Sequence, residues 1–116
     1  TLSNCAIEPE IKDLVNFLIN MGCNIKLIAK RTVRITGVNN LKELNYSVMP
    51  DRIEAGTYLI AAALTEGNLK ITGIDPEIIG TEINILKKIG SKITSRKNEI
   101  LIQGSKKIKR ATRPIF

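Results

Sequence analysis

The chain contains no histidine and no tryptophan, and Cys5 and Cys23 are its only cysteines. The usual Cys/His zinc sites cannot be built from so few ligands, so we expect neither a metal nor another cofactor. A single cysteine pair in a chain rich in lysine and isoleucine is more typical of buried free thiols in a reducing compartment than of a disulfide. This cysteine content predicts a cytoplasmic location.

Aromatic residues are also scarce, at 3% of the chain. The few rings give little surface on which the bases of a single-stranded nucleic acid could stack. The core must instead rest on Ile, Leu, Val and Ala. Uncharged apolar runs are too short to cross a membrane, and acidic residues interrupt the apolar run of residues 1–20, so we expect no signal peptide and no membrane partner.

Positive charge is in excess, with a net charge of +7 over 116 residues, about the length of one ordinary domain. Much of the excess lies in residues 105–110, with Arg113 just beyond. Such a balance suits an anionic partner, such as a nucleotide, a nucleic acid or a phosphorylated metabolite, or it simply keeps the protein soluble.

A block of sequence occurs twice, about 67 residues apart. The first copy runs from E-P-E-I at residues 8–11 through an apolar-striped stretch to Met21-Gly22, and then through two short apolar pieces to Gly37. The second runs from D-P-E-I at residues 75–78 to Ile89-Gly90 and then to Gly104. Such internal repetition of a small unit predicts a repeated architecture in which most apolar residues are scaffold.

Each copy has the pattern of a helix followed by a β-hairpin. Pro9 suits a first helical turn, the following apolar residues recur at helical spacing, and Gly22 ends the helix. Two strands follow at 24–28 and 32–36, joined by a turn at 29–31. In the second copy we expect a helix over 76–89 and strands at 91–95 and 99–103.

Between the copies we expect a strand at 44–48, a helix over 52–64 and a strand at 68–72. The helix is apolar enough to be buried on most sides. A further strand is predicted at 108–115. Residues 42–104 then have the order β-α-β-α-β-β, and residues 8–37 are the closing α-β-β of an earlier unit. The sequence predicts an α/β (α+β) protein.

Two motifs carry a family resemblance: N-C-A-I-E-P-E-I at 4–11 and M-P-D-R-I-E-A-G-T at 49–57. A weaker third is T-R-P-I-F at 112–116. With their spacing, these motifs resemble the UDP-N-acetylglucosamine enolpyruvyl transferases of the EPSP synthase-like family, over roughly residues 3–110. That fold has two domains, each of three β-α-β-α-β-β units. The resemblance implies one full unit plus the second half of another, with residues 1–49 ending the first domain and residues 50–116 beginning the second.

The resemblance implies transfer of the enolpyruvyl group of phosphoenolpyruvate to the 3-hydroxyl of UDP-N-acetylglucosamine. This is the first committed step of peptidoglycan synthesis, on which cell wall, cell shape and cell division depend. The family's Lys-Asn pair, its loop cysteine and its F-P-T-D aspartate find no match here, and Cys5 and Cys23 do not lie in a Gly-rich loop. We therefore expect a central fragment that holds no catalytic residue and is inactive by itself.

The remaining candidates lie at predicted helix starts, which favour anions. Arg52 is the best candidate ligand for a phosphate or carboxylate, or it forms an ion pair with Asp51 or Glu54. Asp51 either pairs with an active-site cation or caps the helix. Glu8 and Glu10 align with family acids at the edge of the substrate cleft, or they supply favourable charge in the first turn. Asp75 and Glu77 share this pattern but have no family role.

Two alternatives remain from the sequence. One is a non-catalytic basic module that binds a nucleotide or nucleic acid, which would leave the 49–57 motif unexplained. The other is the sister enzyme acting on shikimate 3-phosphate, whose motifs match less well over 4–11. In either enzyme the isolated chain would expose apolar surface, so we expect it to self-associate.

Overall fold

The computed structural model describes residues 1–106, 108 and 109. The chain divides into two compact units, Thr1–Met49 and Pro50–Phe116, which are called unit 1 and unit 2 below. The assignment of these units to two domains of an enolpyruvyl transferase stays a prediction.

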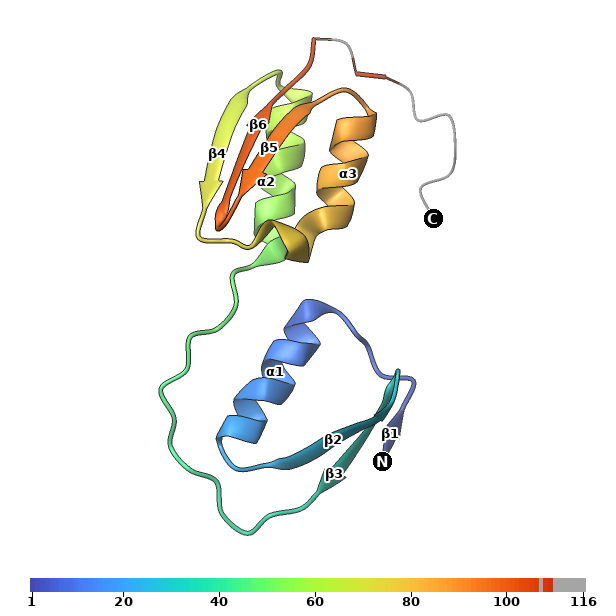
Figure 1. Ribbon diagram of the computed structural model, residues 1–116, viewed down its shortest axis with the longest axis vertical. Helices are drawn as coiled ribbons and strands as arrows, with labels where there is room; N and C mark the ends of the chain where they lie inside the picture. Colours follow the sequence, from blue (N-terminus) through green and yellow to red (C-terminus); the bar gives the residue numbers. More distant parts are fainter. Residues whose placement is uncertain (107, 110–116) are drawn as a thin grey trace. The chain divides into compact units, whose positions relative to one another are not determined.

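Unit 2 consists of two helices on one face of a three-stranded antiparallel sheet (Figure 1). The sheet order is β4-β6-β5, so the second strand of the hairpin is central. Its elements in chain order are α2 (Arg52–Leu64), β4 (Asn68–Thr72), the 3₁₀ helix η1 (Pro76–Ile79), α3 (Gly80–Lys88), β5 (Lys92–Arg96) and β6 (Glu99–Gln103).

The core of unit 2 lies between the sheet and its helices. Alternate residues of β6, Ile100 and Ile102, point to the helices, as the period of two in a strand requires. On α2 the buried residues recur at helical spacing and are mostly small, which allows α2 to approach β6, β4 and α3 closely. The fully buried large side chains are Leu59, Ile74, Ile79 and Ile100.

The prediction that α2 is buried on most sides is wrong. Its opposite face is open, and Ile53 and Leu64 are each 65% exposed. Only the sheet and the neighbouring helical elements cover α2 within its unit, so the apolar residues that face away from them remain in solvent.

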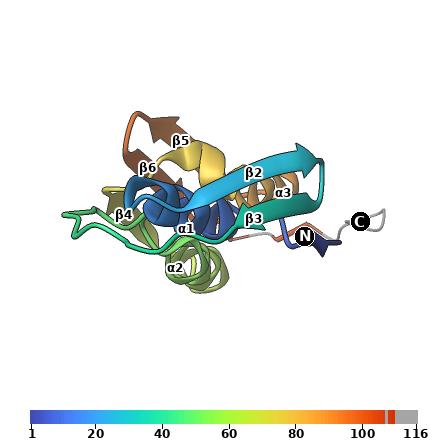
Figure 2. The ribbon, with the colours of Figure 1, turned by 90° about the horizontal axis from the view of Figure 1, so that it is seen from below.

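Unit 1 is a smaller version of the same arrangement, with α1 lying over a sheet of order β1-β3-β2 (Figure 2). Its elements are β1 (Leu2–Ser3), α1 (Pro9–Asn20), β2 (Asn24–Ala29) and β3 (Thr32–Thr36). One helix covers this sheet instead of two, and no residue of unit 1 is buried. The thiols of Cys5 and Cys23 are free, as predicted, but half-buried instead of buried.

The predicted repeat is confirmed by strand register. In the first hairpin Asn24 pairs with Thr36, and in the second Lys92 pairs with Gln103, the aligned positions of the two copies. Gly22 and Gly90 end the two helical segments with φ of 107° and 115°, a conformation that favours glycine. The repeat also includes the strand that precedes α1 and the strand that precedes η1 and α3. In unit 1 β1 pairs with β3, and in unit 2 β4 pairs with β6.

Two predicted elements differ from the structure. Residues 44–48 form no strand, because they lie along α1 and are bound there by side-chain contacts, so the β-α-β-α-β-β unit lacks its first strand. The predicted helix 76–89 is η1 followed by α3. Between them Ile79 is fully buried with ψ of 28°, which interrupts the helix.

Smaller differences concern the strand ends. The first predicted hairpin strand continues to Ala29, and the strand predicted at 91–95 begins at Lys92. Of the strand predicted at 108–115, Ile108 and Lys109 have no regular structure. The rest of that segment, the 112–116 motif and part of the 105–110 basic run lie outside the described residues.

Candidate functional site

The start of α2 holds the two central candidates, Asp51 and Arg52. The Asp51 carboxylate accepts hydrogen bonds from the backbone N–H groups of Ile53 at 2.8 Å and Glu54 at 3.0 Å. These are donors that the helix itself cannot satisfy, so the capping interpretation of Asp51 is confirmed. Pairing of Asp51 with an active-site cation stays a prediction.

Arg52 forms an ion pair with Glu82 of α3, at 3.8 Å between Nη1 and Oε1. Glu82 was not among the partners predicted from the sequence. The two side chains are 22% and 32% exposed, so the pair lies at the edge of the α2–α3 contact and not in the core. Gly56, one turn after Arg52, is buried on the same side: a Cβ there would lie 3.8 Å from Glu82 Cγ. A Cβ at this distance would make an ordinary van der Waals contact with Glu82, so an alanine would also fit there.

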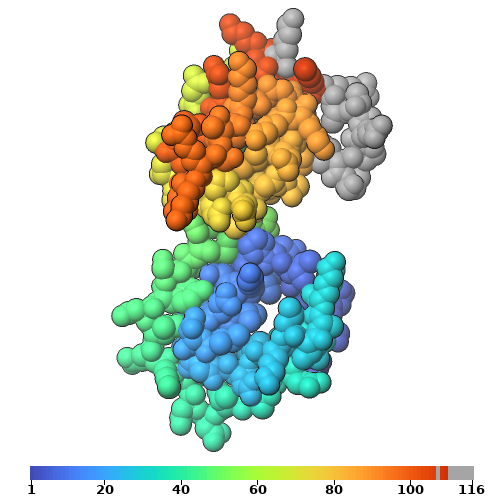
Figure 3. Space-filling view, viewed as in Figure 1, coloured from blue at the N-terminus to red at the C-terminus, as the bar shows by residue number. Residues whose placement is uncertain are grey.

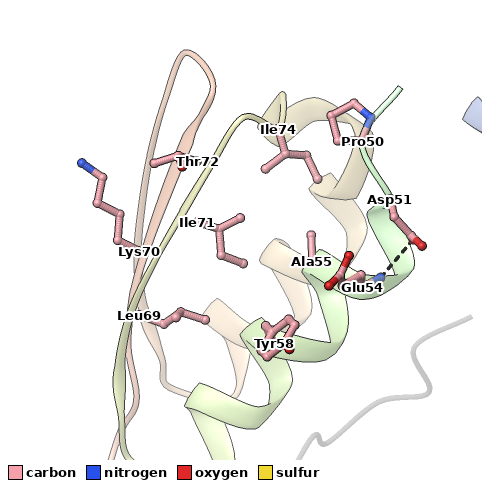
Figure 4. Close-up of a pocket in the computed structure, with 10 residues that line it drawn as sticks. All are labelled: Pro50, Asp51, Glu54, Ala55, Tyr58, Leu69, Lys70, Ile71, Thr72 and Ile74. Carbon is pink, nitrogen blue, oxygen red and sulfur yellow. Dashed lines mark hydrogen bonds between the residues drawn. The ribbon is translucent and has the colours of Figure 1, made fainter. Parts of the chain in front are cut away.

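A pocket of about 400 Å³ opens between the first half of α2 and β4 (Figure 4). Asp51 lies at its edge, but Arg52 does not line it. The Lys70 amino group points away from α2, toward Glu99, whose carboxylate it contacts at 2.5 Å. The carboxylates of Asp51 and Glu54 therefore dominate the charge of this pocket, and it is a poor site for a phosphate. Its lining residues are Pro50, Asp51, Glu54, Ala55, Tyr58, Leu69, Lys70, Ile71, Thr72 and Ile74.

Glu54 and Tyr58 were not predicted as lining residues. A signal for them existed in the sequence, because positions 51, 54, 55 and 58 fall on one side of an α-helix. The opposite wall, from β4, could not be predicted in this way, since it depends on where the sheet places that strand.

Glu8 and Glu10 lie at the start of α1, and both are exposed. Glu8 occupies the N-cap position, but its carboxylate accepts a hydrogen bond from the N–H of Ile7 at 2.9 Å and makes no side-chain cap. In the second copy, Asp75 accepts from the N–H of Glu77 at 3.0 Å. The longer Glu8 side chain turns back along the chain, while the shorter Asp75 reaches forward into the first turn. The favourable first-turn charge of Glu10 fits the structure.

A second hollow, of about 390 Å³, lies in unit 1 between α1 and the hairpin (Figure 3). Its walls are mostly apolar, with Lys12, Lys30 and Arg31 among the lining residues. Within unit 2 the corresponding face of the sheet carries α2, which packs on β6 and β4. The hollow thus lies on the part of the sheet that a helix equivalent to α2 would cover, and unit 1 has no such helix.

Among residues 1–106, 108 and 109, no group of three or more His, Cys, Asp or Glu side chains is arranged to hold a metal ion. None of the helices formed by these residues has the length and apolar character needed to span a bilayer.

Comparison with known proteins places this geometry in a family. Over 109 residues the chain is 92% identical to the UDP-N-acetylglucosamine 1-carboxyvinyltransferase of Pelagibacter ubique (strain HTCC1062), a match that covers 94% of this chain and 26% of the relative. It is 45% identical over 108 residues to UDP-N-acetylglucosamine 1-carboxyvinyltransferase 1 of Caldanaerobacter subterraneus subsp. tengcongensis, covering 93% of this chain and 26% of the relative. The chain thus spans about a quarter of the length of these curated relatives.

A solved structure supports the same fold. The enolpyruvyl transferase NikO from Streptomyces tendae superposes with a TM-score of 0.77 at 25% identity, covering 90% of this chain and 26% of that one. The family model described as EPSP synthase (3-phosphoshikimate 1-carboxyvinyltransferase) matches residues 1–114. The chain therefore belongs to the EPSP synthase family of carboxyvinyl transferases.

Proposed function

We propose that this chain is part of an enzyme that transfers the enolpyruvyl group of phosphoenolpyruvate to the 3-hydroxyl of UDP-N-acetylglucosamine. The single observation that carries the proposal is the 92% identity over 109 residues to a relative named for that reaction. The sister reaction, with shikimate 3-phosphate, is less well supported, because the relatives compared above carry the UDP-N-acetylglucosamine name. A basic module that binds nucleic acid would leave this likeness unexplained.

In this proposal Arg52 binds an anionic group of a substrate. It sits in the first turn of α2, where the helix dipole favours negative charge. The ion pair with Glu82 holds the guanidinium in place, and at 3.8 Å it is long enough for a phosphate or carboxylate with shorter hydrogen bonds to compete. Asp51 fixes the backbone beneath Arg52 through its two cap hydrogen bonds.

The other parts of the proposal follow from the same relationship. Residues 1–49 end the first domain of the enzyme and residues 50–116 begin the second. Glu8 and Glu10 lie at the edge of its substrate cleft. The enzyme acts in the cytoplasm, and its product enters peptidoglycan synthesis. Residues 1–116 alone have no activity, because the acid, base and Lys-Asn pair of the family find no match in them.

The test is an assay of phosphate release by the enzyme that contains this segment. Phosphoenolpyruvate is supplied with either UDP-N-acetylglucosamine or shikimate 3-phosphate. We expect release only with the nucleotide sugar. Release with shikimate 3-phosphate alone would assign the segment to the sister reaction and overturn the proposal.

The role of Arg52 is tested in the same assay. Because Arg52→Ala removes a charged hydrogen bond to substrate, kcat/KM should fall by about 10- to 100-fold, the equivalent of about 1.5–3 kcal/mol. Lys106→Ala is the matched control, since it removes one exposed positive charge of unit 2. Equal losses in the two variants would show that Arg52 contributes only to general charge. Glu82→Gln removes the ion pair but keeps Arg52. If this variant has wild-type stability, a change in its kcat/KM reports substrate binding by Arg52 and not a weakened contact between α2 and α3.

A further inference from the structure

The segment that leaves unit 1, residues 38–49, contains no helix or strand but is bound to α1. Near its beginning, the Lys42 N–H donates to the Met21 carbonyl at 2.8 Å. At its end, the Met49 N–H donates to the Asp13 carboxylate at 3.3 Å. We call residues 38–49 the connecting segment. Its backbone is thus attached at Lys42 to the residue that follows α1 and at Met49 to a side chain of α1.

Tyr46 supplies the contact between these two attachments. Its hydroxyl donates to the Asp13 carboxylate at 2.8 Å and lies 3.2 Å from the Asp13 carbonyl oxygen. Its ring meets Phe17 edge to face, with centroids 5.2 Å apart. Tyr46 is half-buried, while nearby Val48 is 74% exposed. The side chain that holds the segment is therefore a tyrosine with both an apolar and a polar partner.

Asp13 and Phe17 lie one turn apart on α1, so they form one continuous surface under Tyr46. The position aligned with Asp13 in the second copy of the repeat is Gly80, which has no side chain to accept a hydrogen bond. The backbone attachment does recur, since the Lys109 N–H donates to the Ile89 carbonyl at 2.8 Å, at the positions aligned with Lys42 and Met21. The hydrogen bond from Tyr46 to the Asp13 carboxylate therefore adds to an attachment that the repeat already provides.

We infer that Asp13 and Tyr46 are positioning residues that fix the path of the connecting segment along α1 as far as Met49. Met49 is the last residue that Asp13 holds, and Asp51 is already fixed as the cap of α2. Between them lies one residue, and its ring locks φ near −65°. Pro50 alone thus separates the held end of the connecting segment from the capped start of α2. This inference goes beyond the proposed function and does not depend on it.

Amide hydrogen exchange of the 116-residue chain tests the inference. In the wild type we expect the Met49 and Lys42 amides to be protected. Tyr46→Phe keeps the ring on Phe17 but removes the hydroxyl, and it should raise the exchange rate of the Met49 amide by about tenfold or more. Amides of the β2–β3 hairpin should be unchanged. Tyr58→Phe is the matched control, since it removes a hydroxyl from an exposed tyrosine of unit 2.

A second measurement is needed in case Tyr46→Phe destabilises the whole of unit 1, which would raise amide exchange everywhere in it. The chain has two tyrosines, so in a Tyr58→Phe background only Tyr46 contributes phenolate absorbance. The midpoint of that titration should lie above 10.0, and Asp13→Asn should return it toward that value. Two results would overturn the inference. One is a Met49 amide that exchanges in the wild type as fast as in an unstructured peptide, and the other is a Tyr46 titration midpoint that Asp13→Asn leaves unchanged.

Discussion

Gly104, just after β6, has no room for a side chain. A Cβ there would lie 2.6 Å from the Ala62 carbonyl oxygen and 2.7 Å from the Glu66 Cα, and these are backbone atoms that cannot turn aside. The Gly104 N–H also donates to the Gly67 carbonyl at 2.8 Å, which fixes this close approach. Gly104→Ala should therefore destabilise the chain by about 1–3 kcal/mol.

The repeat provides the control for this prediction. Gly37 occupies the aligned position in the first copy, and a Cβ there would meet nothing within 4 Å. Gly37→Ala should be neutral or slightly stabilising, since it restricts the unfolded chain. Urea unfolding followed by circular dichroism compares the two variants. Equal midpoints for both would show that the backbone near Ala62 moves to admit a methyl group.

Asp51 is predicted to contribute to stability as well as to the site. Asp51→Ala leaves the N–H groups of Ile53 and Glu54 without their side-chain acceptor and should cost about 1 kcal/mol. Asp51→Ser, which restores an N-cap oxygen, should recover most of the loss. The measurement is urea unfolding followed by NMR signals from α2. A stability loss that serine leaves uncorrected would mean that the Asp51 charge, and not the cap, is what matters.

Tyr46 gives unit 1 a pH dependence. The hydrogen bond to Asp13 raises the pKa of Tyr46 above 10.0, and burial and the Asp13 charge act in the same direction. The folded chain then keeps a proton that the unfolded chain loses just above that pH. This contribution to stability is present below pH 10.0 and is lost as the pH rises through the higher folded pKa.

The contact between the Phe17 and Tyr46 rings, observed by NMR, reports this loss. We expect the contact to disappear as the pH rises past the folded pKa of Tyr46. In Tyr46→Phe the same contact should survive, because that ring cannot ionise. A contact that disappears at the same pH in both proteins would reflect general alkaline unfolding.

At the scale of single elements, α2 has one buried face and one open face. Leu59 is 0% exposed, and its neighbour Ile60 is 45% exposed. The two residues are similar in size and adjacent in sequence, so they differ mainly in the direction in which they point. Helical periodicity produces this contrast, although the second half of α2, residues 58–64, is apolar almost throughout.

Substitution of these neighbours measures the contrast. Leu59→Ala leaves a cavity among the helices and the sheet and should cost about 2–5 kcal/mol. Ile60→Ala should cost much less in the monomeric chain, because little of its side chain is removed from water. Thermal unfolding at low protein concentration is the measurement. Similar costs for the two variants would mean that another surface covers Ile60 in solution.

At the scale of the whole molecule, the open apolar surfaces predict self-association. Ile53 and Leu64 extend the exposed face of α2, and unit 1 has no buried residue. Each large apolar side chain that a contact removes from water stabilises that contact by about 1.5–3 kcal/mol. Light scattering over a concentration series should therefore show a mass that rises with concentration.

Charge placed on the exposed α2 face should reduce this association. Ile53→Lys with Leu64→Lys adds two positive charges there, and Asn68→Lys with Thr94→Lys adds the same charge to polar strand positions of unit 2. Only the first pair should lower the mass. A monomer at every concentration in the wild-type chain would contradict the prediction.

The sequence by itself determined the class, the repeat and most element boundaries. Hydrophobic periodicity and the paired Pro and Gly signals are local, so α2, β3, β4 and β6 have the bounds that were predicted. The cap by Asp51 was also predictable, because a cap joins residues a few positions apart. The 49–57 motif and the 4–11 motif carried the family.

Tertiary structure decided what depends on distant residues. Glu82 lies thirty positions after Arg52, and only the packing of α3 on α2 brings the two together. Residues 44–48 have the composition of a strand, but a strand needs a partner for its backbone, and the Tyr46 contacts with Asp13 and Phe17 hold the segment on α1 instead. Which face of α2 is covered was decided in the same way, because burial depends on the neighbours that the fold supplies and not on the side chains alone.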